Sequence, residues 1–201
     1  IYSRQYAYTD EEVIQAVLSL VNEVMADLPE DCQLLYENLW WPGLTFCQPA
    51  LAAKLLAGTS HQNTGFMLDT GHLMNTCLEL QDEQEAADYV CRTIDRLGDL
   101  RERIYGMHLH CSLSGAFVRQ MKQQCAGRSG KPLSWQETFD YIARTDQHQP
   151  FRTQAARQIV ELVQPRYLVH EFIQESWADW LQKVRFQRSA LGWYGESRCS
   201  G

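Results

Sequence analysis

The 201-residue chain lacks several features that would each define a class of protein. It has no run of about 20 apolar residues and no recognisable secretory signal peptide, so we expect neither a membrane span nor a membrane partner. Its seven cysteines form no Cys-x-x-Cys pair. They lie scattered among apolar segments, which is typical of reduced thiols in a cytoplasmic protein.

The chain also lacks a surplus of positive charge. Its 18 Lys and Arg residues are outnumbered by 25 Asp and Glu residues, and the formal net charge is -7. Because nucleic acids and anionic membranes are polyanionic, this balance argues against a broad contact with either of them. The hydrophobic content of 45% is enough for a sizeable core, and we expect residues 1–201 to form a single domain.

Segments with strand and helix patterns alternate along the chain. A capping-box pattern, Thr9 followed by Glu12, begins a predicted helix over residues 10–28. Strands are predicted at 33–39, 66–69, 104–110 and 167–172, and further helices at 48–57, 81–97, 153–163 and 176–191. This alternation predicts parallel βαβ units and the α/β class. The polar, Gly-rich residues 112–150 predict a long excursion over the catalytic face, with one helix at 135–144.

Each predicted strand ends in side chains that can bind a metal. Glu37, Asp69, the His108 and His110 pair, and Glu171 follow the four apolar runs in order. In a parallel barrel the carboxyl ends of all strands open on one face, so these groups would share one cavity. A single carboxylate in this position is more typical of a solvated loop or a helix cap, whereas four in succession favour a metal site. Oxygen ligands with one imidazole suit Mn²⁺, Mg²⁺ or Co²⁺ better than structural zinc.

The histidines differ in what their positions indicate. His108 and His110 are two apart on one strand and therefore point to the same face. One of them could be a ligand and the other a hydrogen-bonded core residue or a partner of a ligand. His170 has the opposite parity to Glu171 and is expected to face the helices. His61 and His148 lie in polar loops and receive no role.

An aromatic loop, Trp40-Trp-Pro-Gly-Leu-Thr-Phe46, follows Glu37 directly. Apolar walls of this kind, including Trp40 and Trp41, can exclude water from a metal and cover the face of a sugar. Packing of the rings within the barrel top is an equal alternative.

These residues resemble the xylose-isomerase-like superfamily of metal-dependent TIM barrels. The superfamily includes sugar isomerases and epimerases, inosose and dehydroshikimate dehydratases, and the apurinic-site endonucleases. The resemblance rests on a strand that ends in Glu37, an Asp-x-Gly-His segment from Asp69 to His72, a Gly-Met-His-Leu strand from Gly106 to Leu109, and a last strand that ends in Glu171. It covers about residues 10 to 190.

The resemblance implies a (β/α)8 barrel of which this chain covers about strands five to eight. It implies a divalent metal, Mn²⁺ first and Zn²⁺ among the alternatives, and a small sugar or polyol as the partner. The implied metal ligands are Glu37, Asp69, His108 and Glu171. His72 is the implied contact to the substrate or to a second metal. His110, Trp40 and Trp41 are further expected substrate contacts. Glu37 and Glu171 would be the catalytic acid and base.

Three departures from the family pattern bear on function. The endonucleases complete a three-zinc site with an Asp-x-His pair about a dozen residues after the strand histidine, where this chain reads Arg119-Gln-Met-Lys-Gln123. The ketose 3-epimerases carry an Arg six residues after that histidine, where this chain has Ser114. The length covers only half a barrel, so either strands one to four belong to a longer protein or two copies meet edge to edge as a homodimer.

We therefore expect a metal-dependent isomerase or epimerase that moves a proton through an enediolate. The alternatives are a sugar or cyclitol dehydratase with the same site, a metal-dependent phosphodiesterase of the apurinic endonuclease type, which the missing pair disfavours, and a non-catalytic barrel fragment.

Overall fold

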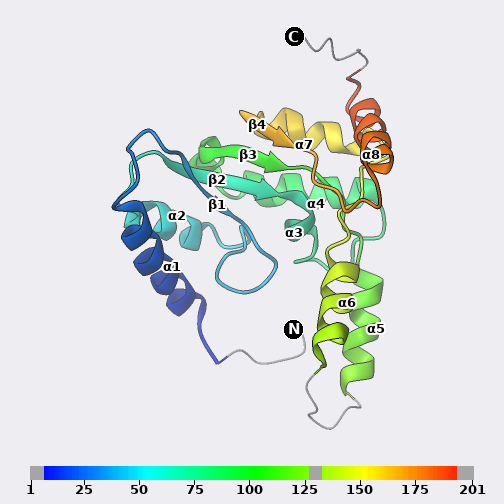
Figure 1. Cartoon of the computed structure of the whole chain (residues 1–201), viewed down its shortest axis with the longest axis horizontal. Coiled ribbons are helices and arrows are strands. Elements are labelled where there is room, and N and C mark those ends of the chain that lie inside the picture. Colours follow the sequence, from blue (N-terminus) through cyan, green and yellow to red (C-terminus); the bar gives the residue numbers. More distant parts are fainter. Residues whose placement is uncertain (1–6, 127–132, 194–201) are drawn as a thin grey trace.

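A parallel sheet lies at the centre of the computed structural model, which describes residues 7–126 and 133–193. Its strands are β1 (Leu34–Glu37), β2 (Thr64–Asp69), β3 (Ile104–His108) and β4 (Tyr167–Val169). The four strands lie side by side in chain order, and each neighbouring pair is parallel (Figure 1). The expected α/β class and parallel βαβ units are confirmed. An eight-stranded barrel stays a prediction, because the described residues contain these four strands in one open sheet.

Helices connect the strands and cover one face of the sheet. The main helices are α1 (Asp10–Met25), α2 (Pro49–Gly58), α4 (Glu83–Asp95), α7 (Ala155–Val163) and α8 (Trp177–Ala190). A short α3 (Thr70–Met74) follows β2, and a 3-10 helix, η1 (Gly98–Arg103), precedes β3. None of the helices in the described part of the chain is long and apolar enough to cross a membrane.

Local sequence determines where these helices begin. Thr9 and Glu12 form the expected capping box, in which each side chain accepts a hydrogen bond from the other residue's backbone N–H. Asp82 caps α4 and Ser176 caps α8 through the same kind of bond. The expected helix over 10–28 ends earlier, at Met25.

The two faces of the sheet have different environments. On one face Phe66, Leu68 and Met107 are fully buried and join the helices in a single core. The alternate residues face the other way, and among them Tyr167 and Val169 are 55% and 42% exposed. Since both faces of a parallel sheet are normally covered, this second face is one that other structure is expected to cover.

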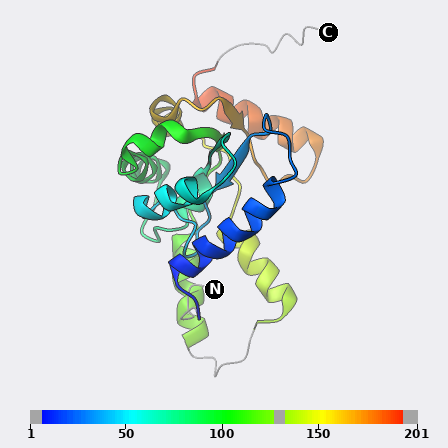
Figure 2. The same cartoon turned by 90° about the vertical axis from the view of Figure 1, so that its left-hand side faces the viewer.

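Residues 112–126 and 133–150 contain two helices, which we call the hairpin, rather than a loop with one helix. α5 (Gly115–Ala126) was not expected, whereas α6 (Trp135–Thr145) agrees with the helix predicted at 135–144. Residues 127–132 of this excursion lie outside the described part of the chain. Figures 1 and 2 show the hairpin projecting from the body of the molecule, below the ends of the strands.

Three expected strands end earlier than predicted. β1 ends at Glu37 instead of residue 39, β3 ends at His108 instead of residue 110, and β4 ends at Val169 instead of residue 172. Asp69 ends β2 and is the N-cap of α3, which follows directly. The three early strand ends fall where the chain leaves the sheet and the candidate site begins.

Candidate metal centre at the strand ends

Three carboxylates meet around one imidazole nitrogen at the carboxyl edge of the sheet. His108 Nδ1 lies 2.9 Å from Glu171 Oε2, 3.4 Å from Glu37 Oε1 and 3.6 Å from Asp69 Oδ2. The four side chains come from the ends of four different strands, as the sequence predicts. We call Glu37, Asp69, His108 and Glu171 the first cluster.

Asp69 anchors this cluster in the fold. Its side chain is fully buried; Oδ1 accepts a hydrogen bond from the His72 backbone N–H at 2.6 Å, and Oδ2 pairs with His110 Nε2 at 3.0 Å. Burial alone would raise the pKa of Asp69, but the neighbouring His108 and His110 rings hold that pKa well below its usual range. The Asp69 carboxylate is therefore ionised and fixed in orientation.

The carboxylates have the opposite effect on His108. The surrounding Asp69, Glu171 and Glu37 side chains raise the pKa of His108 from 6.5 to about 11. The same contact with His108 lowers the pKa of Glu171. The cluster therefore attracts positive charge strongly.

Two buried atoms of this cluster have no hydrogen bond. Among the described residues, His108 Nδ1 and Glu171 Oε2 are both buried, and although they lie 2.9 Å apart as an ion pair, neither makes a hydrogen bond of acceptable geometry. Buried polar atoms are nearly always satisfied, so orphaned atoms on metal-capable side chains need an explanation. A divalent cation between the carboxylates and the imidazole would satisfy both, and this donor set fits Mn²⁺, Mg²⁺ or Co²⁺.

His72, Asp146 and His148 form a second cluster beside the first. Asp146 Oδ2 lies 3.2 Å from His72 Nε2 and 2.7 Å from His148 Nε2. Each of the three offers one ligand atom, and these atoms lie within 4.8 Å of one another. Burial would raise the pKa of Asp146, but the two histidines lower it to about 2. Burial would lower the pKa of His72, but Asp146 and Asp69 raise it to about 9.

Neighbouring groups hold the second cluster in place. The His72 Nδ1–H donates to the Asn38 carbonyl at 2.9 Å, which directs Nε2 toward Asp146. The Asp146 backbone N–H donates to the Ile142 carbonyl at the end of α6. The Ser112 hydroxyl donates to Asp146 Oδ1 at 3.4 Å.

The two glutamates lie between the clusters. Glu37 Oε1 is 3.3 Å from His72 Nδ1, and Glu171 Oε1 is 3.9 Å from His148 Nδ1. Across both clusters the carboxylates of Glu37, Asp69, Asp146 and Glu171 carry four negative charges. Two divalent cations would balance them with the histidines neutral, whereas with one cation the protonated His72 and His148 rings would supply the remaining positive charge.

The sequence analysis missed Asp146 and His148. It sought an Asp-x-His pair about a dozen residues after His108, but the α5–α6 hairpin intervenes and the pair follows it as Asp146-Gln-His148. The fold brings an Asp-x-His pair to the site, so its absence at residues 119–123 does not by itself count against a site with several metals. Asp146 and His148 could have been found from their position at the end of the polar excursion over residues 112–150, where the chain returns to the sheet.

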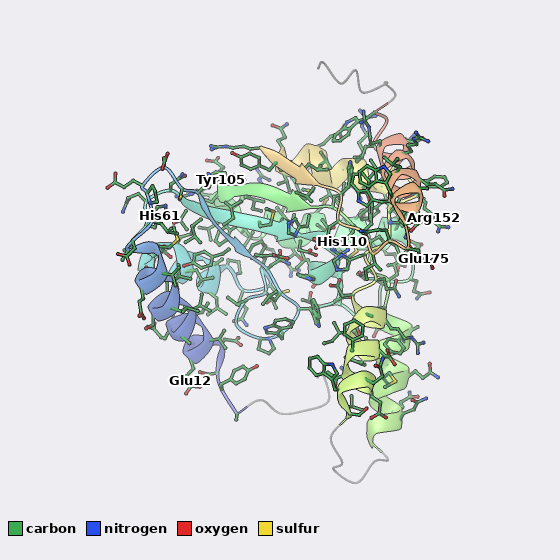
Figure 3. The ribbon with its side chains drawn as sticks, in the orientation of Figure 1. Glu12, His61, Tyr105, His110, Arg152 and Glu175 are labelled. Carbon is green, nitrogen blue, oxygen red and sulfur yellow. The ribbon has the colours of Figure 1, made fainter. Side chains whose placement is uncertain are left out.

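His110 does not lie where a substrate could touch it. It is fully buried, pairs with Asp69, and stacks on His148 with ring centroids 4.1 Å apart (labelled in Figure 3). Its expected role as a substrate contact is wrong, and the alternative, a histidine that orients a ligand, fits these contacts. Space for the ring depends on Gly71, where a Cβ would lie 2.1 Å from His110 Cε1.

The remaining predicted residues are placed as follows. Trp40 is buried and packs on the His72 ring with centroids 4.6 Å apart, and the half-buried Trp41 packs edge-on against Trp40. These rings form a wall of the second cluster. His170 contacts Gln187 of α8, as expected for a residue that faces the helices, and His61 contacts the Cys32 carbonyl away from the clusters.

Comparison with known proteins adds no assignment. No family model, curated protein or solved structure matches the chain. The function is therefore inferred from the two clusters of metal-capable side chains at the strand ends.

Proposed function

We propose that the chain is the metal-binding half of a (β/α)8 barrel of the xylose-isomerase-like kind, and that it isomerises or epimerises a small sugar or polyol with a divalent metal, Mn²⁺ first. The observation that carries this proposal is the convergence of Glu37, Asp69 and Glu171 on His108 Nδ1. We further propose that the protein acts in the cytoplasm.

The uncovered face of the sheet supports the barrel. Tyr167 and Val169 lie on this face, as do Leu35 and Met67, whose side chains approach Gly106 from the neighbouring strands. In a closed barrel this face would be the interior, filled by layers of such side chains. The missing strands would come from further chain or from a second copy that forms a homodimer.

The exposure of the carboxylates divides their roles. Asp69 is fully buried and can reach only a metal and its protein partners, whereas the side chains of Glu37 and Glu171 are 36% and 39% exposed. The two glutamates come from the two edge strands and flank His108. They are therefore the groups that a substrate can reach.

The glutamates would act as the acid and base. A bound metal would polarise a substrate carbonyl and stabilise the enediolate charge that develops after proton removal. One glutamate removes a proton from the carbon beside that carbonyl, and the other returns one. The Trp40 and Trp41 wall excludes water on the side of His72.

Solvent isotope incorporation tests this proposal. The protein would be incubated with Mn²⁺ and a panel of ketoses and inososes in D₂O, alongside the Glu37→Gln and Glu171→Gln variants. We expect deuterium at one substrate carbon with wild type and a loss of about 100-fold or more in each variant. Loss of water from an inosose would instead identify the dehydratase alternative. No deuterium and no product from any substrate would contradict the proposal.

The second cluster favours one further candidate, metal-dependent hydrolysis of a phosphodiester. Paired metal sites recur in phosphatases and nucleases, where two ions stabilise the attacking and the leaving oxygen. His72, Asp146 and His148 supply the second set of ligands that such a site needs. Because the net charge of -7 opposes a DNA substrate, a small phosphodiester is the better candidate.

The two candidates can be separated by one variant. Asp146→Asn removes the central carboxylate of the second cluster and leaves the first cluster intact. Turnover of bis-p-nitrophenyl phosphate by wild type, lost in Asp146→Asn, would favour hydrolysis. Isotope exchange that survives in Asp146→Asn would favour the isomerase.

A further inference from the structure

One buried side chain of α8 contacts three separate segments near the metal centre. Gln187 is fully buried. Its Nε2 donates to the Leu109 carbonyl at 2.7 Å and to His170 Nδ1 at 2.8 Å, and its Oε1 accepts from the Phe151 backbone N–H at 2.9 Å. Both amide N–H groups and the amide oxygen are therefore used.

Each of these contacts lies next to a metal-capable residue. Leu109 separates His108 from His110, and His170 immediately precedes Glu171. Phe151 follows His148 by three positions. The three segments leave β3, α6 and β4, so a single amide joins parts of the chain that belong to both clusters.

The regular structure of the sheet does not reach these positions. The β3–β4 pairing ends at His108 and Val169, and the next backbone bond, from the Leu109 N–H to the Val169 carbonyl, is the last before Glu171. Beyond this point His170 is held through Gln187. The Gln187 side chain thus links the segments that follow β3 and β4, beyond the point where the backbone hydrogen bonds between these strands end.

We propose that Gln187 is a positioning residue for the metal centre, because its amide fixes the segments that carry ligands after β3, α6 and β4. This inference rests on the metal centre proposed above. A buried amide is a costly way to fill space, since a methionine of similar volume would pack without any polar group to satisfy. The three hydrogen bonds therefore account for an amide at this buried position, which packing alone does not explain.

Cobalt binding tests the inference. Co²⁺ alone would be titrated into the wild-type protein and into Gln187→Met, with affinity and the visible absorption spectrum as readouts and circular dichroism as the check of folding. We expect Gln187→Met to fold but to bind Co²⁺ about 10- to 100-fold more weakly, as is typical when a partner of metal ligands is removed. We also expect an altered absorption band, because the ligands would lose their relative positions.

Gln158→Met is the matched control. Gln158 lies on α7, and its amide binds the half-buried Asp88 rather than a segment of the metal centre. This variant should keep the wild-type affinity and spectrum. Wild-type Co²⁺ binding by Gln187→Met, or an equal loss in both variants, would overturn the positioning role alone. Failure of the wild type to bind Co²⁺ would overturn the metal centre and this inference together.

A second variant covers the case in which Gln187→Met does not fold. His170→Leu removes one of the three contacts and leaves the bonds to Leu109 and Phe151 in place. We expect Co²⁺ affinity to fall by about tenfold in this variant, with the same direction of spectral change. An unchanged affinity and spectrum in folded His170→Leu would overturn the inference.

Discussion

At the scale of single residues, the protonation of His108 and His72 determines how the charge of the site depends on pH. In the metal-free protein the carboxylates raise the pKa of His108 to about 11 and that of His72 to about 9. Both rings are therefore protonated at neutral pH, and their positive charges partly compensate the carboxylates around them. A metal ion must displace these protons, since only a neutral imidazole can ligate.

The first prediction concerns the pH dependence of metal affinity. Binding that displaces the His108 proton should strengthen by about tenfold per pH unit between pH 6 and 8, and more steeply if His72 also loses its proton. Calorimetric titration of Mn²⁺ in buffers of different ionisation enthalpy measures both the affinity and the protons released. An affinity that does not vary over this range would contradict the assignment of His108 as a ligand.

The metal-free protein should show the opposite trend in stability. Because the pKa of His108 rises on folding, its contribution to stability is complete below the unfolded value of 6.5 and is lost as the pH rises toward about 11. Denaturant unfolding of the chelator-treated protein should therefore give a lower free energy of unfolding at pH 9 than at pH 6. A higher value at pH 9 would show that other groups outweigh the histidines.

At the scale of elements, the sequence predicted the order of helices and strands better than the residues at which the strands end. Hydrophobic periodicity and the Thr9–Glu12 capping box located the helices and the order of the strands. The pattern could not show that β3 stops at His108, because Leu109 is as apolar as a strand residue. The next residue, His110, then turns inward to Asp69 instead of outward to a substrate.

The hairpin is the second place where sequence reasoning fell short. The Gly-rich composition around Gly115 suggested a loop, yet α5 begins there, with the glycine backbone close to the Leu78 carbonyl. The hairpin separates His108 from Asp146 in the chain while leaving them close in the fold. Spacing along the sequence could not reveal this, whereas the four strand-end groups needed only the alternation of strands and helices.

The second prediction concerns α3 and its close contact with His110. In Gly71→Ala the new methyl group would lie 2.1 Å from the fully buried His110 ring, whose Nε2 pairs with Asp69 while the His110 backbone N–H donates to the Thr70 hydroxyl. We expect the free energy of unfolding to fall by about 1–3 kcal/mol, although alanine is the better helix former. Denaturant unfolding measures the change.

Gly98→Ala is the comparison for this variant. Gly98 has a φ of +57° but nothing within 4 Å of an added Cβ, so only backbone strain opposes the substitution. It should cost about 1 kcal/mol and leave metal affinity unchanged, whereas Gly71→Ala should lower that affinity as well. Equal effects of the two variants on metal affinity would contradict the role given to His110.

At the scale of the whole molecule, the two faces of the sheet differ in how far they are covered. Its helix-covered face is a packed core, and its other face exposes Tyr167 and Val169 at the β4 edge. The apolar side chains of Leu20 and Val24 on α1 are also exposed, as is Leu28 just beyond the end of this helix. Further strands and helices of a barrel would bury both surfaces.

The third prediction tests this covering in the protein. If a barrel closes over the second face, Val169→Lys would place a charge in its interior and lower the free energy of unfolding by several kcal/mol, of the order expected for an unpaired buried charge. The control is Val24→Lys on α1. This lysine would lie at a helix–helix contact near the surface, where its long side chain can reach water. A Val169→Lys protein as stable as wild type would contradict the barrel.

The existence of the metal centre is the claim on which the other proposals depend. Metal content per chain, measured by elemental analysis after equilibration with Mn²⁺ and gel filtration, tests it most directly. The comparison is between wild type, Asp69→Asn, and Asp95→Asn as a control whose carboxylate pairs with Arg101 away from the site. Wild type and Asp95→Asn should retain one to two ions per chain and folded Asp69→Asn almost none; equally little metal in wild type and Asp69→Asn would contradict the account.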